Sequence, residues 1–366
     1  MGAALDAYVA QRLPAALLDQ ALRAGAAVEV RGIYPAHMRA VLPGATLADR
    51  GHSFGTAKTF NRIRPHYFAV GDDGARRLVV AVPPGRDYVL HYASLVGHFL
   101  RSRGAELAAV VRYPAAEASV AEWTRLAELV EPGDRVLIGY VQELVPLLAD
   151  RGAGVVDESG NEFYGAVRLR IPDSGDEVCA LGVRFSFWGC ISARVAAACR
   201  RLGAREVVYA GKLGALTDPR DIYRRLFSPS RYLHLAPEPR FPAPAPGPRN
   251  GLHELFPELD TGVHMSVATV LEEDTQQRAY GDRFGVTSID NEIAQIALAL
   301  AAPAPEPPAA FSALHFATDY LHANGERARP DVYNLTNHRR RDALALKNRM
   351  LRAIADRLAA YYRHPL

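Results

Sequence analysis

Cysteine and long apolar runs are both scarce in this chain of 366 residues. The three cysteines, Cys179, Cys190 and Cys199, are odd in number and loosely spaced. This argues against a disulfide framework or a zinc site and indicates a reducing, cytoplasmic compartment. No stretch approaches the roughly 18 consecutive apolar residues of a membrane-spanning helix, so we expect no membrane partner. The amino-terminal segment has no charged leader followed by an apolar run, so we expect no secretory signal.

Charge of one sign is also scarce, because the formal net charge is only +3. That value is too small to predict nucleic acid as a partner. The basic run at 338–341 opens a predicted helix, and we interpret it as a solvated helix start. Lysine accounts for only three of the 43 basic residues, Lys58, Lys212 and Lys347. A lysine in such a chain can mark a position where arginine would not serve.

Several common catalytic motifs are missing. The sequence contains no GxGxxG after a strand pattern and no GxxxxGK[ST]. HExxH and CxxC are absent as well, whereas the segment 51–55 (GHSFG) matches GxSxG. These absences disfavour a dinucleotide oxidoreductase, a P-loop NTPase and a zinc hydrolase. We therefore expect neither a bound metal nor an organic cofactor.

Apolar strand patterns and amphipathic helix patterns alternate along most of the chain, which predicts an α/β fold with crossover helices. Helices are predicted over 5–24, 88–103, 119–130, 141–151, 191–202, 290–301 and 343–361. Strands are predicted over 78–82, 107–111, 135–140, 206–210, 265–271 and 311–316. The turn at 131–134 (EPGD) suggests a boundary between an amino-terminal α/β domain, 1–130, and a second domain, 131–366.

One strand end in the second half offers glycines beside a lysine. The segment 207–216 (VVYAGKLGAL) carries Gly211 and Gly214, which let a ligand approach the backbone, and Lys212, which can offer charge to an anion. Ligands collect at the carboxyl ends of strands in doubly wound sheets. Taken alone, the two glycines are better explained by a tight turn.

Two further strand ends carry carboxylates. In 286–292 (VTSIDNE), Asp290 and Glu292 open a helix, and in 314–319 (LHFATD) an apolar strand ends at Thr318 and Asp319. Taken one at a time, each carboxylate could simply interact favourably with a helix dipole or cap a helix or turn. The order and spacing of all three segments favour a functional site instead.

In this order the segments resemble the nucleoside phosphorylase superfamily, which includes purine and uridine phosphorylases, methylthioadenosine/S-adenosylhomocysteine nucleosidase and AMP nucleosidase. The matching segments are 189–193 (GCISA), 202–204 (LGA), 210–216 (AGKLGAL), 289–297 (IDNEIAQIA) and 317–319 (ATD). The resemblance covers about residues 135–366. It implies a three-layer α/β/α fold with a mixed central sheet, preceded by an α/β extension of unknown role.

The resemblance also implies a reaction, cleavage of the N-glycosidic bond of a purine nucleoside or nucleotide through an oxocarbenium-like transition state. Asp319 would protonate the leaving base, and Glu292 would hold the ribose hydroxyls and favour a cationic sugar. The other residues expected to bind substrate are Asn291, Asp290, Thr318, Ser266, Gly211 and Gly214.

The sequence departs from the family at three positions. Asn291 stands where the family usually has Met, and Tyr209 and Lys212 stand where hexameric phosphorylases have Arg and Ser. Lys212 could hold inorganic phosphate as a co-substrate or a 5′-phosphate of the substrate, and Arg184 and Arg194 are further candidates for anion binding. Phosphorolysis and hydrolysis therefore both stay open.

The expected partners are a small nucleoside or nucleotide and further copies of the chain in a homo-oligomer. The alternative is a nucleoside-binding sensor, or a degenerate paralogue, without turnover. The retention of both Glu292 and Asp319 argues against that alternative, because binding alone needs no proton donor at a strand end. A tailoring enzyme of a specialised nucleoside pathway is a third hypothesis.

Overall fold

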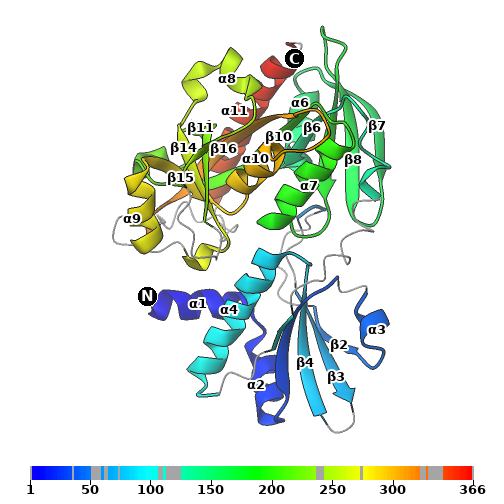
Figure 1. Cartoon of the computed structure of the whole chain (residues 1–366), viewed down its shortest axis with the longest axis vertical. Coiled ribbons are helices and arrows are strands. Elements are labelled where there is room, and N and C mark those ends of the chain that lie inside the picture. The colour runs from blue at the N-terminus through cyan, green and yellow to red at the C-terminus, as the bar shows by residue number, and fades with distance from the viewer. Residues whose placement is uncertain are drawn as a thin grey trace. The chain divides into compact units, whose positions relative to one another are not determined.

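Two separate β-sheets organise the chain in the computed structural model (Figure 1). The structure describes residues 2–34, 37–50, 59–61, 65–72, 75–105, 110–112, 125–235, 243–272, 275–321, 327–328 and 341–364. The chain divides into a first unit, residues 1–121, and a second unit, residues 122–366. The predicted boundary at 131–134 lies a few residues further along. Among the described helices, none combines the length and apolar character needed to cross a membrane.

The first unit is built on a five-stranded sheet with the order β2-β3-β4-β1-β5. Strand β1 pairs in parallel with β4 and β5, whereas β3 pairs antiparallel with β2 and β4. The elements are α1 (Gly2–Arg12), α2 (Ala15–Arg23), β1 (Ala27–Gly32), α3 (Met38–Val41), β2 (Thr46–Asp49), β3 (His66–Asp72), β4 (Ala75–Val82), α4 (Arg86–Ser102) and β5 (Val110–Arg112).

The apolar run 78–82 forms part of β4 and is buried throughout, as its continuous pattern predicts. The single helix predicted over 5–24 is wrong, because the structure has two helices that separate at Pro14. Proline has no N–H for the helical ladder and disfavours helical backbone at the preceding residue. Residues 119–124 of the predicted helix 119–130 and residues 107–109 of the predicted strand 107–111 lie outside the described residues, as do residues 338–340 of the basic run.

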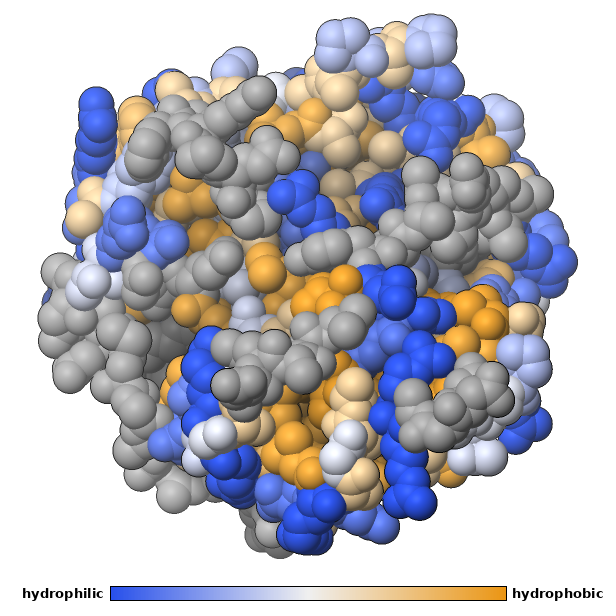
Figure 2. Space-filling view, turned by 60° about the horizontal axis from the view of Figure 1, so that its bottom comes forward, coloured by the Kyte–Doolittle hydropathy of each residue, from blue (hydrophilic) through white to orange (hydrophobic). Residues whose placement is uncertain are grey.

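Some large hydrophobic side chains are exposed at the surface. Figure 2 shows hydrophobic residues between ridges of hydrophilic ones on one face of the molecule. In the first unit, the described side chains of Val41, Leu47 and Val111 are large, apolar and exposed. They belong to three different elements, α3, β2 and β5.

The second unit is built on a twelve-stranded mixed sheet. The main strand order is β13-β12-β14-β15-β10-β6-β9-β8-β7, and β16 pairs with β10, β11 and β17. The strands are β6 (Arg135–Gly139), β7 (Gly154–Gly160), β8 (Tyr164–Arg170), β9 (Glu177–Val183), β10 (Glu206–Ala215), β11 (Leu226–Phe227), β12 (Arg231–Leu235), β13 (Ala245–Pro246), β14 (Val263–Val267), β15 (Val286–Asp290), β16 (Ala310–Leu321) and β17 (Arg327–Ala328). The α-helices are α6 (Val141–Ala149), α7 (Cys190–Arg201), α8 (Gly251–Leu255), α9 (Thr275–Arg283), α10 (Ile293–Ala301) and α11 (Arg341–Tyr362).

Helices cover this sheet in two layers (Figure 1). Helices α7 and α10 pack on each other, and α6 and α11 form a second pair. Consecutive residues of β16 point to opposite faces, and His315 lies against Tyr209 whereas Phe316 lies against Tyr140, which precedes α6. The α/β fold with a mixed central sheet between helical layers is therefore confirmed.

A buried ion pair fixes the amino-terminal ends of β6 and β10. The Nε atom of Arg135 lies 2.9 Å from Oε2 of Glu206, and neither side chain is exposed. The Arg135 guanidinium also lies 4.7 Å from the ring centroids of both Tyr361 and Tyr362. Because these tyrosines end α11, the contacts anchor that helix to the sheet, at the opposite end of β10 from Lys212 and Gly214.

Candidate active site at the carboxyl ends of β10, β15 and β16

The three strand ends that the sequence singles out meet at Gly214. This residue pairs with Ile289 of β15 on one side and with Asp319 of β16 on the other. A Cβ atom placed on Gly214 would lie 3.2 Å from Cγ2 of Ile289 and 3.5 Å from Oδ1 of Asp319. Glycine thus leaves room for the two neighbouring segments to approach β10.

Asp319 stands just past an irregularity in β16. Leu213 pairs with Ala317, but Gly214 pairs with Asp319, so Thr318 is an extra residue in the ladder. The Thr318 hydroxyl donates a hydrogen bond of 3.1 Å to Oδ1 of Asp319. The Asp319 side chain is half-buried, so the structure places this carboxyl at the strand end with part of its surface accessible.

Glu292 lies at the start of α10, beside residues from two other elements. Its carboxyl accepts a hydrogen bond from the backbone of Gly189, which precedes α7, and hydrogen-bonds the hydroxyl of Tyr209 on β10. Burial raises the pKa of Glu292 well above its ordinary value, and the negative charge of Asp290 raises it further. The positive charge of Lys212 acts in the opposite direction. These surroundings favour the protonated form of Glu292.

The carboxylate of Asp290 accepts hydrogen bonds from groups inside the protein. Its Oδ1 atom accepts hydrogen bonds from the Ser266 hydroxyl at 2.6 Å, from His264 Nε2 at 2.8 Å and from the backbone N–H of Ile293 at 3.1 Å. Burial alone would raise the pKa of Asp290, but the contacts with His264 and Ser266 lower it below the ordinary value. The carboxylate therefore fixes the first turn of α10 to β14.

Two residues expected to bind substrate are likewise part of this internal frame. Ser266 is fully buried, and its hydroxyl also accepts the backbone N–H of Ala294 at 2.8 Å. Asn291 is nearly buried, and its Nδ2 donates to the carbonyl of Val267 at 2.8 Å. The polar groups of Ser266, Asp290 and Asn291 are thus bonded within the fold, and their contact with a substrate stays a prediction.

Two buried histidines extend the polar cluster. His264 bonds Ser288 through Nδ1, at 2.8 Å, as well as Asp290. His315 lies over Gly211, with its ring centroid 4.5 Å from that of Tyr209, and among the described atoms neither ring nitrogen has a hydrogen-bond partner. Burial lowers the pKa of His315 to about 3, so the ring is neutral at physiological pH.

The sequence patterns do not single out His315. The available signal for His315 was a single histidine within an apolar strand, but the facing Gly211 lies more than 100 residues away and is placed there only by strand pairing.

The three predicted anion-binding residues lie in different places. Lys212 is exposed near the end of β10, where its charge acts on Glu292. Arg184 donates through Nε to the backbone carbonyl of Tyr164 at 2.9 Å, which ties the end of β9 to the start of β8. Arg194 is half-buried in α7, the helix whose amino end contacts Glu292. Of these three residues, Lys212 is the one that the described contacts place at the strand ends.

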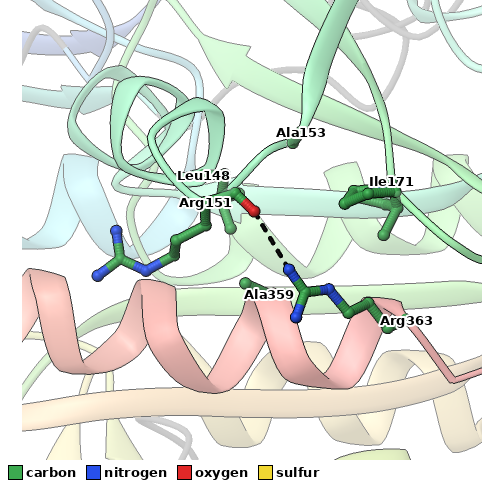
Figure 3. Close-up of a pocket in the computed structure, with 7 residues that line it drawn as sticks. Leu148, Arg151, Ala153, Ile171, Ala359 and Arg363 are labelled. Atoms are coloured by element: carbon green, nitrogen blue, oxygen red, sulfur yellow. Dashed lines mark hydrogen bonds between the residues drawn. The ribbon is translucent and has the colours of Figure 1, made fainter.

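A small cavity lies elsewhere, between the end of α6 and α11 (Figure 3). Its volume of about 10 Å³ suits roughly one water molecule. The lining residues are Leu148, Arg151, Ala153, Ile171, Pro172, Ala359 and Arg363. In Figure 3 the Arg363 guanidinium donates to the backbone carbonyl of Arg151, at 3.2 Å, so the contact ties α11 to the loop after α6. Within the described ranges no three His, Cys, Asp or Glu side chains gather as a metal site would require.

A curated protein and several solved structures that are similar to this chain carry names of different enzyme classes. No family model matches the chain. The chain is 32% identical over 305 residues to a curated protein of the fungus Cordyceps militaris that is named "Oxidoreductase cns1". This match covers 76% of the chain but only 38% of that protein's length.

Similar solved structures carry the names of the superfamily that the sequence motifs resemble. They include a Campylobacter jejuni 5′-methylthioadenosine/S-adenosyl homocysteine nucleosidase (14% identity, 63% of this chain, 99% of that chain, TM-score 0.46). A futalosine hydrolase mutant of Helicobacter pylori aligns at 12% identity over 64% of this chain and 99% of that chain, with a TM-score of 0.45. A schistosoma purine nucleoside phosphorylase aligns at 12% identity over 68% of this chain and 98% of that chain, with a TM-score of 0.44. With TM-scores below 0.5, any assignment of function has to rest on the residues of the site.

Proposed function

We propose that the second unit cleaves the N-glycosidic bond of a purine nucleoside or nucleotide. The observation that carries the proposal is the position of Gly214, which brings the carboxyl of Asp319 next to the segment that ends in Glu292. A proton donor to the base and a group that favours a cationic sugar both promote departure of the base.

In the proposed reaction the bond between the base nitrogen and C1′ breaks, and its electron pair goes to the base. Asp319 donates a proton to N7 of the purine, so the base leaves neutral, and positive charge develops on the sugar. Glu292 bonds the ribose hydroxyls, and the growing positive charge favours its ionised form. Water or phosphate then adds to C1′. The proton that the nucleophile releases, from water or from hydrogen phosphate, restores Asp319.

Lys212 is the residue on which the choice of nucleophile depends. Its charge already acts on Glu292, so an anion bound by Lys212 would lie near the ribose. Inorganic phosphate at that position gives phosphorolysis, whereas a 5′-phosphate of the substrate leaves water as the nucleophile. A lysine is a compact point charge that serves either ligand.

The name of the curated relative does not decide this activity. More than half of that protein lies outside the matched region, so its redox activity can reside in the part that has no counterpart here. This chain has no GxGxxG after a strand. We therefore propose that the matched part of the relative supplies the nucleoside-handling portion of a longer protein.

A second candidate is nucleoside binding without turnover. It is favoured by the internal use of Asp290, Ser266 and Asn291, which leaves fewer side chains to face a substrate than the sequence predicted. The same experiment decides between the two candidates.

The test is a screen for base release from purine and pyrimidine nucleosides and their 5′-monophosphates, with and without phosphate, and with nicotinamide cofactors as a redox control. We expect release from a purine compound. The variant Asp319→Asn should lower the rate by at least about 100-fold, because proton transfer contributes that much, while ligand binding persists. Asp173→Asn is the matched control, since Asp173 is 84% exposed and its left-handed backbone (φ 72°) suits asparagine.

Three outcomes would contradict the proposal. An unchanged rate in Asp319→Asn excludes Asp319 as the proton donor. Binding of a nucleoside without release of any base supports the non-catalytic candidate. Cofactor reduction by this chain would place redox activity in the matched region.

A further inference from the structure

The sheet of the first unit carries a buried carboxylate that three arginines share. Glu29 lies in β1, and its side chain is only 2% exposed. Nε of Arg31 lies 2.5 Å from Oε1 of Glu29, and Nε of Arg112 lies 3.2 Å from the same oxygen. Nη1 of Arg77 lies 3.5 Å from the other oxygen, Oε2. One negative charge thus meets three positive charges in this group of four side chains, which we call the Glu29 cluster.

Strand pairing brings the members of the Glu29 cluster to one face of the sheet. Arg31 of β1 is the register partner of Arg112 in the parallel strand β5. In the same way, Ala27 of β1 is the partner of Arg77 in β4. Because side chains alternate between the two faces along a strand, Ala27, Glu29 and Arg31 point to the same side. In the described part of the sheet β5 is the last strand, so the cluster lies beside the sheet edge.

Arg31 and Arg112 form a like-charge pair across two strands. Neighbouring strands lie about 4.7–4.9 Å apart, so register partners of like charge repel each other. Glu29 contacts both guanidinium groups through a single oxygen, and its one charge neutralises only one of the two. The pair therefore keeps surplus positive charge, which a bound anion would balance.

The same two guanidinium groups have donors to spare. An arginine donates through Nε and through both terminal nitrogens. Arg31 and Arg112 face Glu29 through Nε, and among the described atoms their terminal nitrogens have no acceptor. Arg112 is 54% exposed and Arg31 is partly exposed, so solvent reaches the pair. Glu29 thus fixes both groups and leaves their terminal nitrogens for a further acceptor.

We propose that the Glu29 cluster binds a phosphate group, with Arg31 and Arg112 as the donors. The guanidinium fork matches phosphate oxygens in a bidentate manner, which makes arginine a preferred residue for this ligand. A phosphate monoester carries about −1.5 to −2 charges at pH 7 and so balances the surplus positive charge. Glu29 is a positioning residue, because it holds both guanidinium groups before the ligand arrives.

The ligand is a phosphate ion or the phosphate group of a small molecule, since both offer the same oxygens. The Glu29 cluster belongs to the first unit, so its ligand does not depend on the reaction proposed for the second unit.

The test follows the Nε–H signals of 15N-labelled arginine in the full chain by NMR, while inorganic phosphate is added at constant ionic strength. The signals of Arg31 and Arg112 are assigned by their loss in Arg31→Gln and Arg112→Gln. We expect both signals to shift and to saturate in the wild type. In Arg112→Gln the Kd that the Arg31 signal reports should rise about 10- to 100-fold, the usual effect of losing a hydrogen bond between charged groups.

Arg103→Gln is the matched control. Arg103 also belongs to the first unit, is exposed, and pairs with Asp19 at 3.0 Å through Nε. This substitution removes the same charge as Arg112→Gln but no member of the Glu29 cluster. At physiological ionic strength exposed charges outside a site are largely screened, so the Kd for phosphate should change by less than about 2-fold.

A nucleoside 5′-monophosphate and the unphosphorylated nucleoside are titrated in the same way. Tighter binding of the monophosphate identifies a phosphate ester as the ligand, and equal affinity identifies the phosphate ion; either result supports the site. If Arg112→Gln does not fold, Arg31→Gln takes its place, with the Arg112 signal as the reporter.

Four results would overturn the inference. Neither arginine signal shifts at millimolar phosphate, or chloride at equal ionic strength reproduces the shift. The unphosphorylated nucleoside shifts both signals as much as phosphate does. Arg103→Gln weakens phosphate binding as much as Arg112→Gln does. Because these signals report on the first unit, a failure of base release in the second unit leaves each of these results readable.

Discussion

Gly211 shows how one missing side chain makes room for a buried histidine. A Cβ atom at this position would lie 2.5 Å from Nε2 of His315, closer than real contacts allow. The His315 ring cannot easily move aside, because it lies edge-on against Tyr209. We predict that Gly211→Ala destabilises the second unit by about 1–3 kcal/mol, the usual cost of overpacking a core. Urea denaturation followed by tyrosine and tryptophan fluorescence measures this.

Gly154→Ala is the control for that substitution. Gly154 also lies in a strand of the second unit, but a Cβ there meets no atom within 4 Å, and the residue is exposed. We expect this control to change the free energy of unfolding by less than about 1 kcal/mol. Equal effects of the two alanines would show that His315 has room to move, and the close approach at Gly211 would then carry no stability cost.

At the scale of elements, the first turn of α10 depends on a buried serine and carboxylate. The Ser266 hydroxyl donates to Asp290 and accepts the N–H of Ala294, so it joins β14 to the helix. Ser266→Ala leaves both partners without that bond inside the protein. We predict a loss of about 1–3 kcal/mol in the free energy of unfolding, measured by urea denaturation.

Ser230 and Asp260 form the matched surface pair, because the Ser230 hydroxyl donates to Oδ1 of Asp260 at 2.8 Å in an exposed setting. Water can replace this bond, so Ser230→Ala should cost less than about 1 kcal/mol. If Ser266→Ala costs no more than Ser230→Ala, then α10 is held by its apolar packing and not by Ser266.

The sequence predicts those helices and strands whose hydrophobic pattern continues over many consecutive residues. The helices over 191–202 and 343–361 and the strands over 135–140 and 206–210 all form, with shifts of a few residues at their ends. Strand β7 escapes prediction, because all seven of its residues are exposed and it has no apolar alternation.

The candidate site is only partly predictable for a similar reason. Glycines and carboxylates at strand ends point to Gly214, Glu292 and Asp319 without knowledge of the pairing. The internal use of Ser266 and Asp290, and the position of His315 over Gly211, follow from contacts between segments far apart in the sequence. No local pattern encodes which donor a buried carboxylate receives.

At the scale of the whole molecule, the two units differ in their buried titratable groups. His91 of α4 is buried in the first unit, where burial and the charge of Arg12 lower its pKa to about 3. His315 is its counterpart in the second unit. The second unit also contains Glu206 and Glu292, whose pKa values are raised, chiefly by burial. Acid therefore acts on the two units through different sets of groups.

These pKa shifts determine whether the free energy of unfolding of each unit rises or falls with pH. Between pH 6.5 and about 3, the unfolded first unit binds a proton at His91 that the folded unit does not, so its stability falls as the pH falls. From pH 7 to pH 5 this loss is on the order of 2 kcal/mol. In the second unit His315 acts in the same direction. Glu292 opposes it, because its raised pKa lets the folded state keep its proton above pH 4.5.

We therefore predict that acidification from pH 7 to pH 5 destabilises the first unit more than the second. Hydrogen exchange with mass spectrometry, corrected for intrinsic rates, should show a larger loss of protection in α4 than in α7. His91→Phe keeps an aromatic ring between Tyr8 and Tyr92, whose centroids lie 6.0 and 5.4 Å from that of His91, and removes the titration. The excess loss in α4 should disappear in this variant. If α4 loses protection equally in the wild type and in His91→Phe, another group carries the acid sensitivity of the first unit.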